Sequence, residues 1–173
     1  MASGACRGTV IADVATIYTI GHSLHSMDRL VALLRAHAIE LLVDVRSHPA
    51  SRRAPHFSRA PLARALATHA ISYDFAGGEL GGRPDARAYY REDGSVDYAR
   101  RREAPDFQSR IESLLELAAT RRIAIMCAEE DPSHCHRQLL VAPALRAGGA
   151  TILHIRKDGR AEPDSPSQLE LLR

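Results

Sequence analysis

The chain has 173 residues, of which 45% are hydrophobic and 25% charged, a balance that fits one globular domain with a substantial core rather than two domains. No apolar run reaches about 18 residues, and the first residues lack the basic start and long apolar centre of a secretory signal. These features exclude a membrane-spanning helix and predict a cytoplasmic protein without membrane contact. In that reducing compartment we expect the cysteines to be free thiols.

Short β-rich runs alternate with helical patterns, the order expected of an α/β sheet built from right-handed crossovers. The predicted strands cover residues 17–20, 41–45, 71–75, 123–127 and 151–155. Four helices are predicted: one capped by Ser26, one with Pro61 in its first turn, one over 105–121, and one that follows Cys135 and contains Pro143. Pro143 should kink the last helix or shorten it.

These elements predict a single three-layer α/β domain over residues 16–160, with a mostly parallel central sheet of about five strands. Residues 1–15 and 161–173 are expected to be tails. Inside the domain, the polar, glycine-rich stretch 76–105 is far longer than an ordinary connection and predicts an ordered lid or binding loop. Its tyrosines, such as Tyr89, could stack on a base or ring, or could instead fix the loop onto its own domain.

Polar side chains follow three of the predicted strands where each strand ends. His22 and Ser23 follow the first, Asp44, Arg46 and His48 the second, and Cys127, Glu129 and the turn 134–137 the fourth. In an open α/β sheet, ligands bind at the carboxyl ends of the strands. This convergence predicts a functional site at that edge.

The net charge is only +2, but the basic residues are unevenly placed. Residues 45–73 contain five arginines, among them Arg46 and Arg52, and no acidic residue. Guanidinium groups bind phosphate or carboxylate with two hydrogen bonds, so this segment is expected to attract an anion such as a nucleotide or nucleic acid. A genome-wide preference for arginine would explain the number of arginines without any function.

The chain resembles domain-of-unknown-function family 488 from about residue 18 to residue 155. Four motifs carry the resemblance: TIGHS at 19–23, DVRSHPASRRAPHF at 44–57, ELGG at 79–82 and MCAEEDPSHCHR at 126–137. The resemblance implies an α/β fold and a site made from these motifs, which adds Phe57, Gly81 and Gly82 to the candidate residues. It implies no particular activity.

Two catalytic chemistries fit these residues. In the first, Asp44 and Glu129, with His22 or His136 nearby, act as acid and base in a hydrolase that cleaves a glycosidic or related bond in a nucleotide-like or nucleic-acid substrate. An ion pair between Asp44 and Arg46 or Arg52 is the structural alternative. In the second, Cys127 is the nucleophile of a hydrolase or transferase acting on a small phosphorylated metabolite, although the acidic residues that follow it argue against phosphate.

The possible metal ligands are Cys127, His134, Cys135, His136 and His22, but the adjacent residues 134–136 cannot all face one ion and no second close Cys/His pair follows, so a metal ion is not predicted. No cofactor is expected either. A non-catalytic nucleic-acid-binding module is the remaining alternative. We favour the carboxylate hydrolase, with Asp44, Glu129, Cys127 and His22 as catalytic candidates. The candidates for substrate binding are Ser23, Arg46, His48, Arg52, Phe57, Gly81, Gly82, Tyr89, Cys135, His136 and Arg137.

Overall fold

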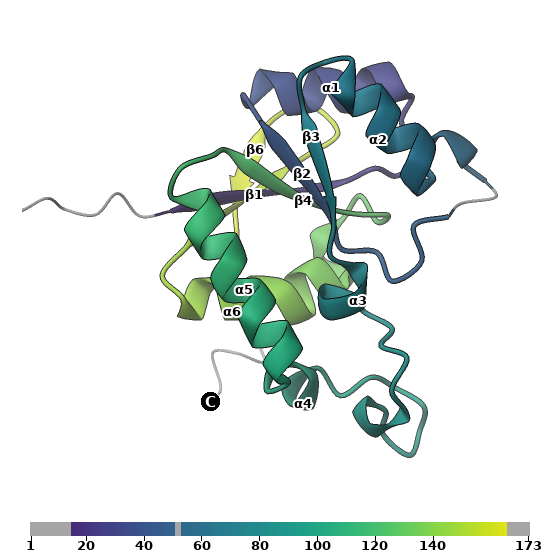
Figure 1. Cartoon of the computed structure of the whole chain (residues 1–173), viewed down its shortest axis with the longest axis vertical. Helices are drawn as coiled ribbons and strands as arrows, with labels where there is room; N and C mark the ends of the chain where they lie inside the picture. Colours follow the sequence, from purple (N-terminus) through teal and green to yellow (C-terminus); the bar gives the residue numbers. More distant parts are fainter. Residues whose placement is uncertain (1–14, 51–52, 166–173) are drawn as a thin grey trace, which may run out of the picture.

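A six-stranded sheet forms the centre of the computed structural model, which describes residues 15–50 and 53–165 (Figure 1). The strands are β1 (Thr16–Gly21), β2 (Leu41–Asp44), β3 (Ser72–Phe75), β4 (Ile123–Cys127), β5 (Thr151–Ile155) and β6 (Ala161–Pro163). They lie in the order β3-β2-β4-β1-β5-β6, and all neighbours are parallel except β5 and β6. The predicted α/β class and mostly parallel sheet are confirmed.

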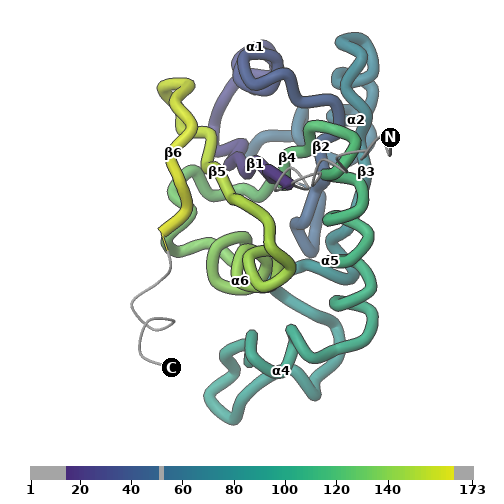
Figure 2. Tube along the Cα trace, turned by 90° about the vertical axis from the view of Figure 1, so that its left-hand side faces the viewer, coloured from purple at the N-terminus to yellow at the C-terminus, as the bar shows by residue number. Residues whose placement is uncertain are grey.

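Helices cover both faces of the sheet, which gives the predicted three layers. The hydrophobic core on one face includes side chains of α1 (Met27–Ala36) and α2 (Arg59–Ala67). The core on the other face includes side chains of α5 (Pro105–Ala118) and α6 (Ala142–Ala147). Figure 2 shows the two helical layers on opposite sides of the sheet. β4 lies in the middle of the sheet and is buried along its whole length.

Local signals in the sequence account for where several helices begin. The Ser26 hydroxyl accepts a hydrogen bond from the Arg29 main-chain N–H (3.1 Å), so it caps α1 as predicted. Pro105 occupies the first turn of α5, where its missing N–H costs nothing. Before α6 the chain makes a wide π-helical turn, Arg137–Val141. The Leu139 carbonyl, which an N–H at Pro143 would otherwise bind, accepts a hydrogen bond from Arg102 (3.2 Å).

The long connection between β3 and α5 is ordered by short helical turns: α3 (Gly77–Leu80), a 3₁₀ turn (Arg87–Tyr89) and α4 (Tyr98–Arg102). Arg101, only 2% exposed, forms an ion pair with Asp106 (2.7 Å) and lies over the ring of Tyr89 (4.9 Å). Tyr89 also packs against the hydrophobic core under α5 and α6, so it fixes the connection onto its own domain, which is the structural alternative that its sequence context left open.

The C-terminal part of the described chain differs from the prediction. A tail was expected from residue 161, but β6 extends the sheet there and pairs with β5. The Asp164 carboxylate, only 2% exposed, forms an ion pair with Arg146 and accepts a hydrogen bond from His154 Nε2 (3.0 Å). The sequence AEP is too short and too polar to be predicted as a strand. Among the described residues, no helix is both long enough and apolar enough to cross a membrane.

Candidate active site

The ends of β1, β2 and β4 lie side by side, as the sequence predicts, but their side chains point to opposite faces of the sheet. Cys127 belongs to the core under α5 and α6, together with Val43 and Val45 of the β2 segment. Because side chains alternate along a strand, Asp44 points to the face covered by α1 and α2. Met126, the register partner of Asp44, also belongs to that face. Two separate polar clusters result.

The first cluster, called the Asp44 cluster, consists of Asp44, Arg46, His22 and Tyr73. The Asp44 carboxylate is fully buried and accepts hydrogen bonds from Arg46 Nε (2.8 Å) and Nη2 (2.6 Å), from the Arg46 main-chain N–H (3.1 Å) and from the Tyr73 hydroxyl (2.8 Å). This bidentate pair is the structural alternative to acid–base chemistry that the sequence left open. Both carboxylate oxygens are occupied, so Asp44 has no oxygen free for substrate.

His22 is held in one neutral form by its neighbours. Its Nδ1–H donates to the Ser23 carbonyl (2.9 Å), because a carbonyl can only accept. Its Nε2 therefore accepts from Arg46 Nη1 (3.0 Å). Burial first, and then the charge of Arg46, lower the pKa of His22 to about 4. Phe57 packs against the imidazole ring (4.5 Å between centroids). His22 is thus a structural acceptor for a buried guanidinium.

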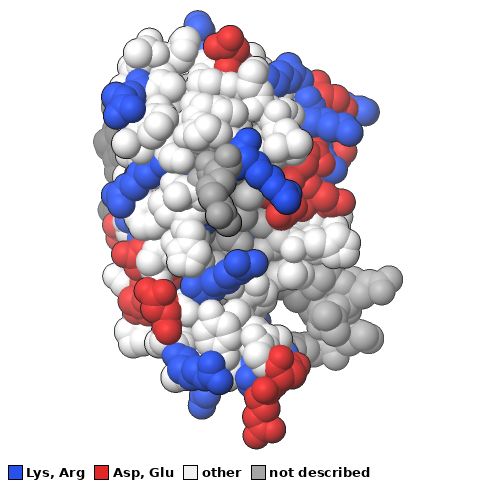
Figure 3. Space-filling model, turned by 90° about the vertical axis from the view of Figure 1, so that its right-hand side faces the viewer, with Lys and Arg blue, Asp and Glu red and all other residues white. Residues whose placement is uncertain are grey.

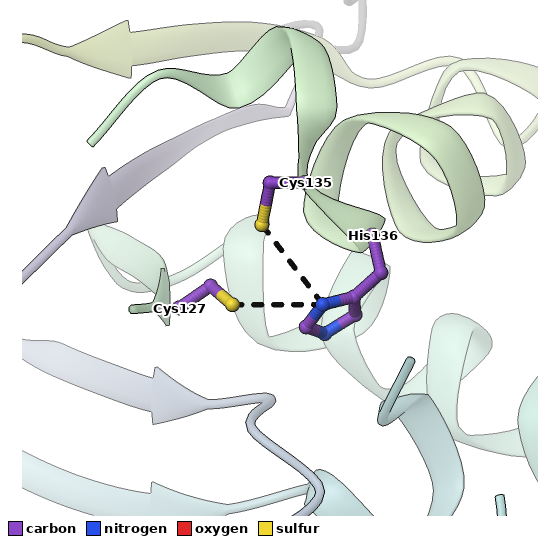
Figure 4. A group of neighbouring side chains, drawn as sticks. All are labelled: Cys127, Cys135 and His136. Atoms are coloured by element: carbon purple, nitrogen blue, oxygen red, sulfur yellow. Dashed lines mark hydrogen bonds between the residues drawn. The ribbon is translucent and has the colours of Figure 1, made fainter. Parts of the chain in front are cut away.

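The second cluster, called the thiol cluster, consists of Cys127, Cys135 and His136 (Figure 4). His136 Nε2–H donates to the main-chain carbonyl of Val45 (2.9 Å). Its Nδ1 therefore carries a lone pair, and it lies 3.5 Å from Cys127 Sγ and 3.9 Å from Cys135 Sγ. Both cysteines are free thiols and are 6% and 2% exposed, respectively. Unlike the Asp44 cluster, this group directs an unprotonated nitrogen at two sulfur atoms.

The two thiols differ in acidity. A hydrogen bond from the Cys135 thiol, together with the main-chain N–H groups of Ala128 and Glu129 and the charge of Arg137, lowers the pKa of Cys127 to about 7, against the opposing effect of burial. The same hydrogen bond and burial raise the pKa of Cys135 to about 12. Cys127 is therefore the thiol that ionises, and Cys135 is the donor that stabilises its thiolate.

The loop that follows Cys127 is fixed by Arg137. This side chain is 1% exposed, and its guanidinium donates to the carbonyls of Glu129 and Glu130 (2.6 Å for Glu130). The loop crosses β1 directly over Gly21, where a Cβ would overlap the Glu129 carbonyl. The Glu129 side chain itself is exposed. Arg137 thus stabilises the loop rather than standing free to bind an anion.

The ELGG motif lies against the thiol cluster. A Cβ on Gly82 would lie 2.7 Å from Cβ and Cγ of His136, so only glycine lets the chain pass this close to the imidazole. Gly81 packs as closely against Ser47, whose hydroxyl accepts the Arg83 main-chain N–H (2.9 Å). The motifs at 79–82 and 126–137 therefore meet at His136.

Tyr98 of α4 packs against the hydrophobic core that contains Cys127 and Cys135. Burial, and then the proximity of Cys135 and Cys127, raise the pKa of its hydroxyl. Tyr98 also lines a cavity of about 730 Å³ between α4, α5 and α6, together with apolar side chains that include Phe107 and Ile111. In the sequence, Tyr98 is one of several tyrosines in the 76–105 stretch. Its place beside the sulfurs depends on how α4 folds back, which has no local sequence signal.

The remaining candidate residues are placed as follows. Ser23 has a left-handed backbone (φ 45°), and its N–H donates to the Ala128 carbonyl (2.8 Å), so it joins β1 to the loop after β4. His48 is exposed. The main-chain carbonyl of Phe57 accepts a hydrogen bond from the Arg46 guanidinium (2.8 Å). Arg52 lies outside the described residues. The sequence also gave no sign that the Val45 carbonyl orients His136, because any residue supplies a carbonyl.

Comparison with known proteins identifies the family but no activity. No curated protein and no solved structure matches the chain. A family described as "Domain of unknown function DUF488" matches residues 26–143, a span that contains three of the four motifs, those at 44–57, 79–82 and 126–137. This span covers more than half of the chain, so the protein belongs to the DUF488 family.

Proposed function

We propose that the protein is a thiol-dependent hydrolase or transferase in which Cys127 is the nucleophile and His136 the base. One observation carries this proposal: the Val45 carbonyl fixes the His136 tautomer, so the Nδ1 lone pair lies 3.5 Å from Cys127 Sγ. A nucleophile, a base within reach and a third group that orients the base form the arrangement that activates cysteine in enzymes.

The reaction follows from this geometry. His136 Nδ1 takes the proton of Cys127, and the sulfur bonds to the carbonyl carbon of the substrate while the bond to the leaving group breaks. His136 returns the proton to the leaving group. Water, deprotonated at the same nitrogen, then attacks the thioester, which releases the carboxylic acid and restores the thiol. An alcohol or amine in place of water gives transfer instead of hydrolysis.

The surroundings favour a carbonyl substrate over a phosphate. The two guanidinium groups predicted to clamp a phosphate, Arg46 and Arg137, are buried and engaged with Asp44 and with loop carbonyls. Three acidic residues follow Cys127 in the sequence and would repel a phosphate dianion. We assign an apolar acyl group to the cavity beside Tyr98, whose lining includes Phe107 and Ile111.

The carboxylate mechanism receives less support, because Asp44 is held in a buried ion pair and points to the other face of the sheet. A nucleic-acid substrate stays a prediction from the sequence. On the side of the molecule seen in Figure 3, basic and acidic side chains are interspersed rather than gathered into one basic patch. Salt-dependent binding of labelled oligonucleotides would test that prediction separately.

The proposal is tested with p-nitrophenyl esters at a chelator concentration that removes free metal. We expect a burst of one nitrophenolate per chain, and a mass increase equal to one acyl group on the peptide that contains Cys127. Cys127→Ser should lose both signals, and Cys6→Ser should keep them. If p-nitrophenyl hexanoate reacts no faster than p-nitrophenyl acetate, the assignment of the acyl group to the cavity is wrong. If no adduct forms on Cys127, the proposed function is wrong.

A further inference from the structure

The thiol cluster also has the composition and spacing of a metal site. Its three donor atoms are Cys127 Sγ, Cys135 Sγ and His136 Nδ1, and all lie within 4.8 Å of one another. Around a tetrahedral Zn²⁺, sulfur at about 2.3 Å and nitrogen at about 2.0–2.1 Å place neighbouring ligand atoms roughly 3.5–3.8 Å apart. The two sulfur–nitrogen distances here, 3.5 and 3.9 Å, are close to this spacing.

We propose that Cys127, Cys135 and His136 bind one Zn²⁺ ion, with the fourth position open to water or another small ligand. Two thiolates and one imidazole suit Zn²⁺ better than harder ions such as Mg²⁺ or Ca²⁺, which prefer oxygen ligands. With both cysteines ionised, the ligand set carries two negative charges and neutralises the ion, which suits a site as buried as this one.

The imidazole is already oriented as a ligand. A metal-binding histidine commonly donates its second ring N–H to a carbonyl or carboxylate, which fixes the tautomer and the ring. The Val45 carbonyl does this for His136, and Gly82 packs closely against the imidazole. No movement of these two neighbours is needed for Nδ1 to bind an ion.

Cys127 is among the possible metal ligands in the sequence, but no metal is predicted there because the adjacent residues His134, Cys135 and His136 cannot all face one ion. In the structure His134 is exposed, and Cys127 from the end of β4 takes its place beside Cys135 and His136. The 3₁₀ turn Pro132–His134 returns the chain, so residues eight and nine positions after Cys127 face its sulfur.

Zinc binding and the proposed thiol chemistry exclude one another at any moment, because Zn²⁺ would occupy the lone pair of His136 Nδ1, which then could not act as the base, and would hold the Cys127 sulfur as a ligand. The metal site does not depend on the proposed function, since it needs only the three donor atoms. If both hold, Zn²⁺ inhibits the enzyme reversibly and a chelator restores activity.

The test uses the full chain, reduced and freed of metal. Titration with Zn²⁺ against a chromophoric chelator measures affinity, and Co²⁺ in place of Zn²⁺ reports thiolate coordination through its charge-transfer absorption. We expect one ion per chain. Cys135→Ser and His136→Gln each remove a ligand and should weaken zinc binding by more than about 100-fold. Changing only a residue that hydrogen-bonds to a ligand weakens binding by at most about that factor. His134→Gln and Cys6→Ser are matched controls and should bind as the unmodified chain does.

The outcomes separate the two proposals. Cys135→Ser removes a zinc ligand and replaces the thiol that donates to Cys127 with a hydroxyl, so zinc binding should be lost, whereas the acylation burst in chelator should be slower but still reach one nitrophenolate per chain. Zinc binding without a burst would support the metal site and contradict the thiol enzyme. Two results would overturn the metal site. One is a burst from a chain that binds no stoichiometric zinc. The other is zinc binding that stays unchanged in Cys135→Ser and His136→Gln, with circular dichroism showing that both variants are folded.

Discussion

The Asp44 cluster and the thiol cluster lie a few residues from the same sheet edge, yet they differ in what their polar atoms do. In the Asp44 cluster the carboxylate, the guanidinium and both imidazole nitrogens have partners inside the protein. In the thiol cluster an imidazole nitrogen without a proton faces two sulfurs. Buried polar groups that satisfy one another stabilise a fold, whereas a base directed at a nucleophile or a metal is arranged for chemistry.

Replacing the imidazole in each cluster tests most directly whether the two clusters have different roles. His136→Gln keeps the side chain polar but removes the base, so the rate constant for acylation of Cys127 should fall by about 10²–10⁴-fold. His22→Gln keeps an acceptor for Arg46 and should leave this rate constant within about twofold, since His22 lies in the Asp44 cluster. Stopped-flow measurement of nitrophenolate release provides both values. If His22→Gln slowed acylation more than His136→Gln, the chemistry would belong to the Asp44 cluster and not to the thiol cluster.

Asp44→Asn tests the structural role of the other cluster. It leaves the Arg46 charge buried without a counter-ion, so we expect the free energy of unfolding to fall by about 3–5 kcal/mol. Urea denaturation measures this loss. The double variant Asp44→Leu/Arg46→Met removes both charges and should lose less than the single variant. An Asp44→Asn protein of unchanged stability that has lost all activity would instead favour the carboxylate mechanism.

Gly82→Ala tests whether the thiol cluster needs the His136 imidazole in its present position. The new Cβ would lie 2.7 Å from His136, so the imidazole must shift by a fraction of an ångström to about one ångström. Such a misplacement costs up to about 100-fold in rate, and zinc affinity should fall as well. Gly78→Ala is the matched control, because its Cβ meets no atom within 4 Å. Equal acylation rates in the two variants would show that His136 does not need its present position.

The smallest expected effect is a pH dependence of stability from His22. Its pKa in the folded protein, about 4, is lower than its ordinary value of 6.5, so the unfolded chain binds more protons between these values. Stability should therefore decrease as the pH falls from about 6.5 towards 4, by at most about 1.4 kcal/mol per pH unit. His22→Gln should reduce this slope and the exposed His134→Gln should not, as measured by denaturation at several pH values.

Much of the fold could be predicted from local patterns. The apolar run 123–127 defines β4 because a strand buried on both faces needs no alternation, and Ser26 and Pro105 mark helix starts through hydrogen-bonding rules that act within one turn. β6 was not predicted, because its three residues form a strand through pairing with β5 and not through their own β propensity.

For the site, the amino-acid sequence is enough to predict which residues reach the carboxyl edge of the sheet, because strand ends and motifs are local features. Which of these residues lie together depends on the folded arrangement. Side-chain alternation sends Asp44 and Cys127 to opposite faces, and the turn after Pro132 brings Cys135 and His136 back to Cys127. The Val45 carbonyl then sets the His136 tautomer. These relations depend on contacts between residues up to 91 positions apart, which no local pattern encodes.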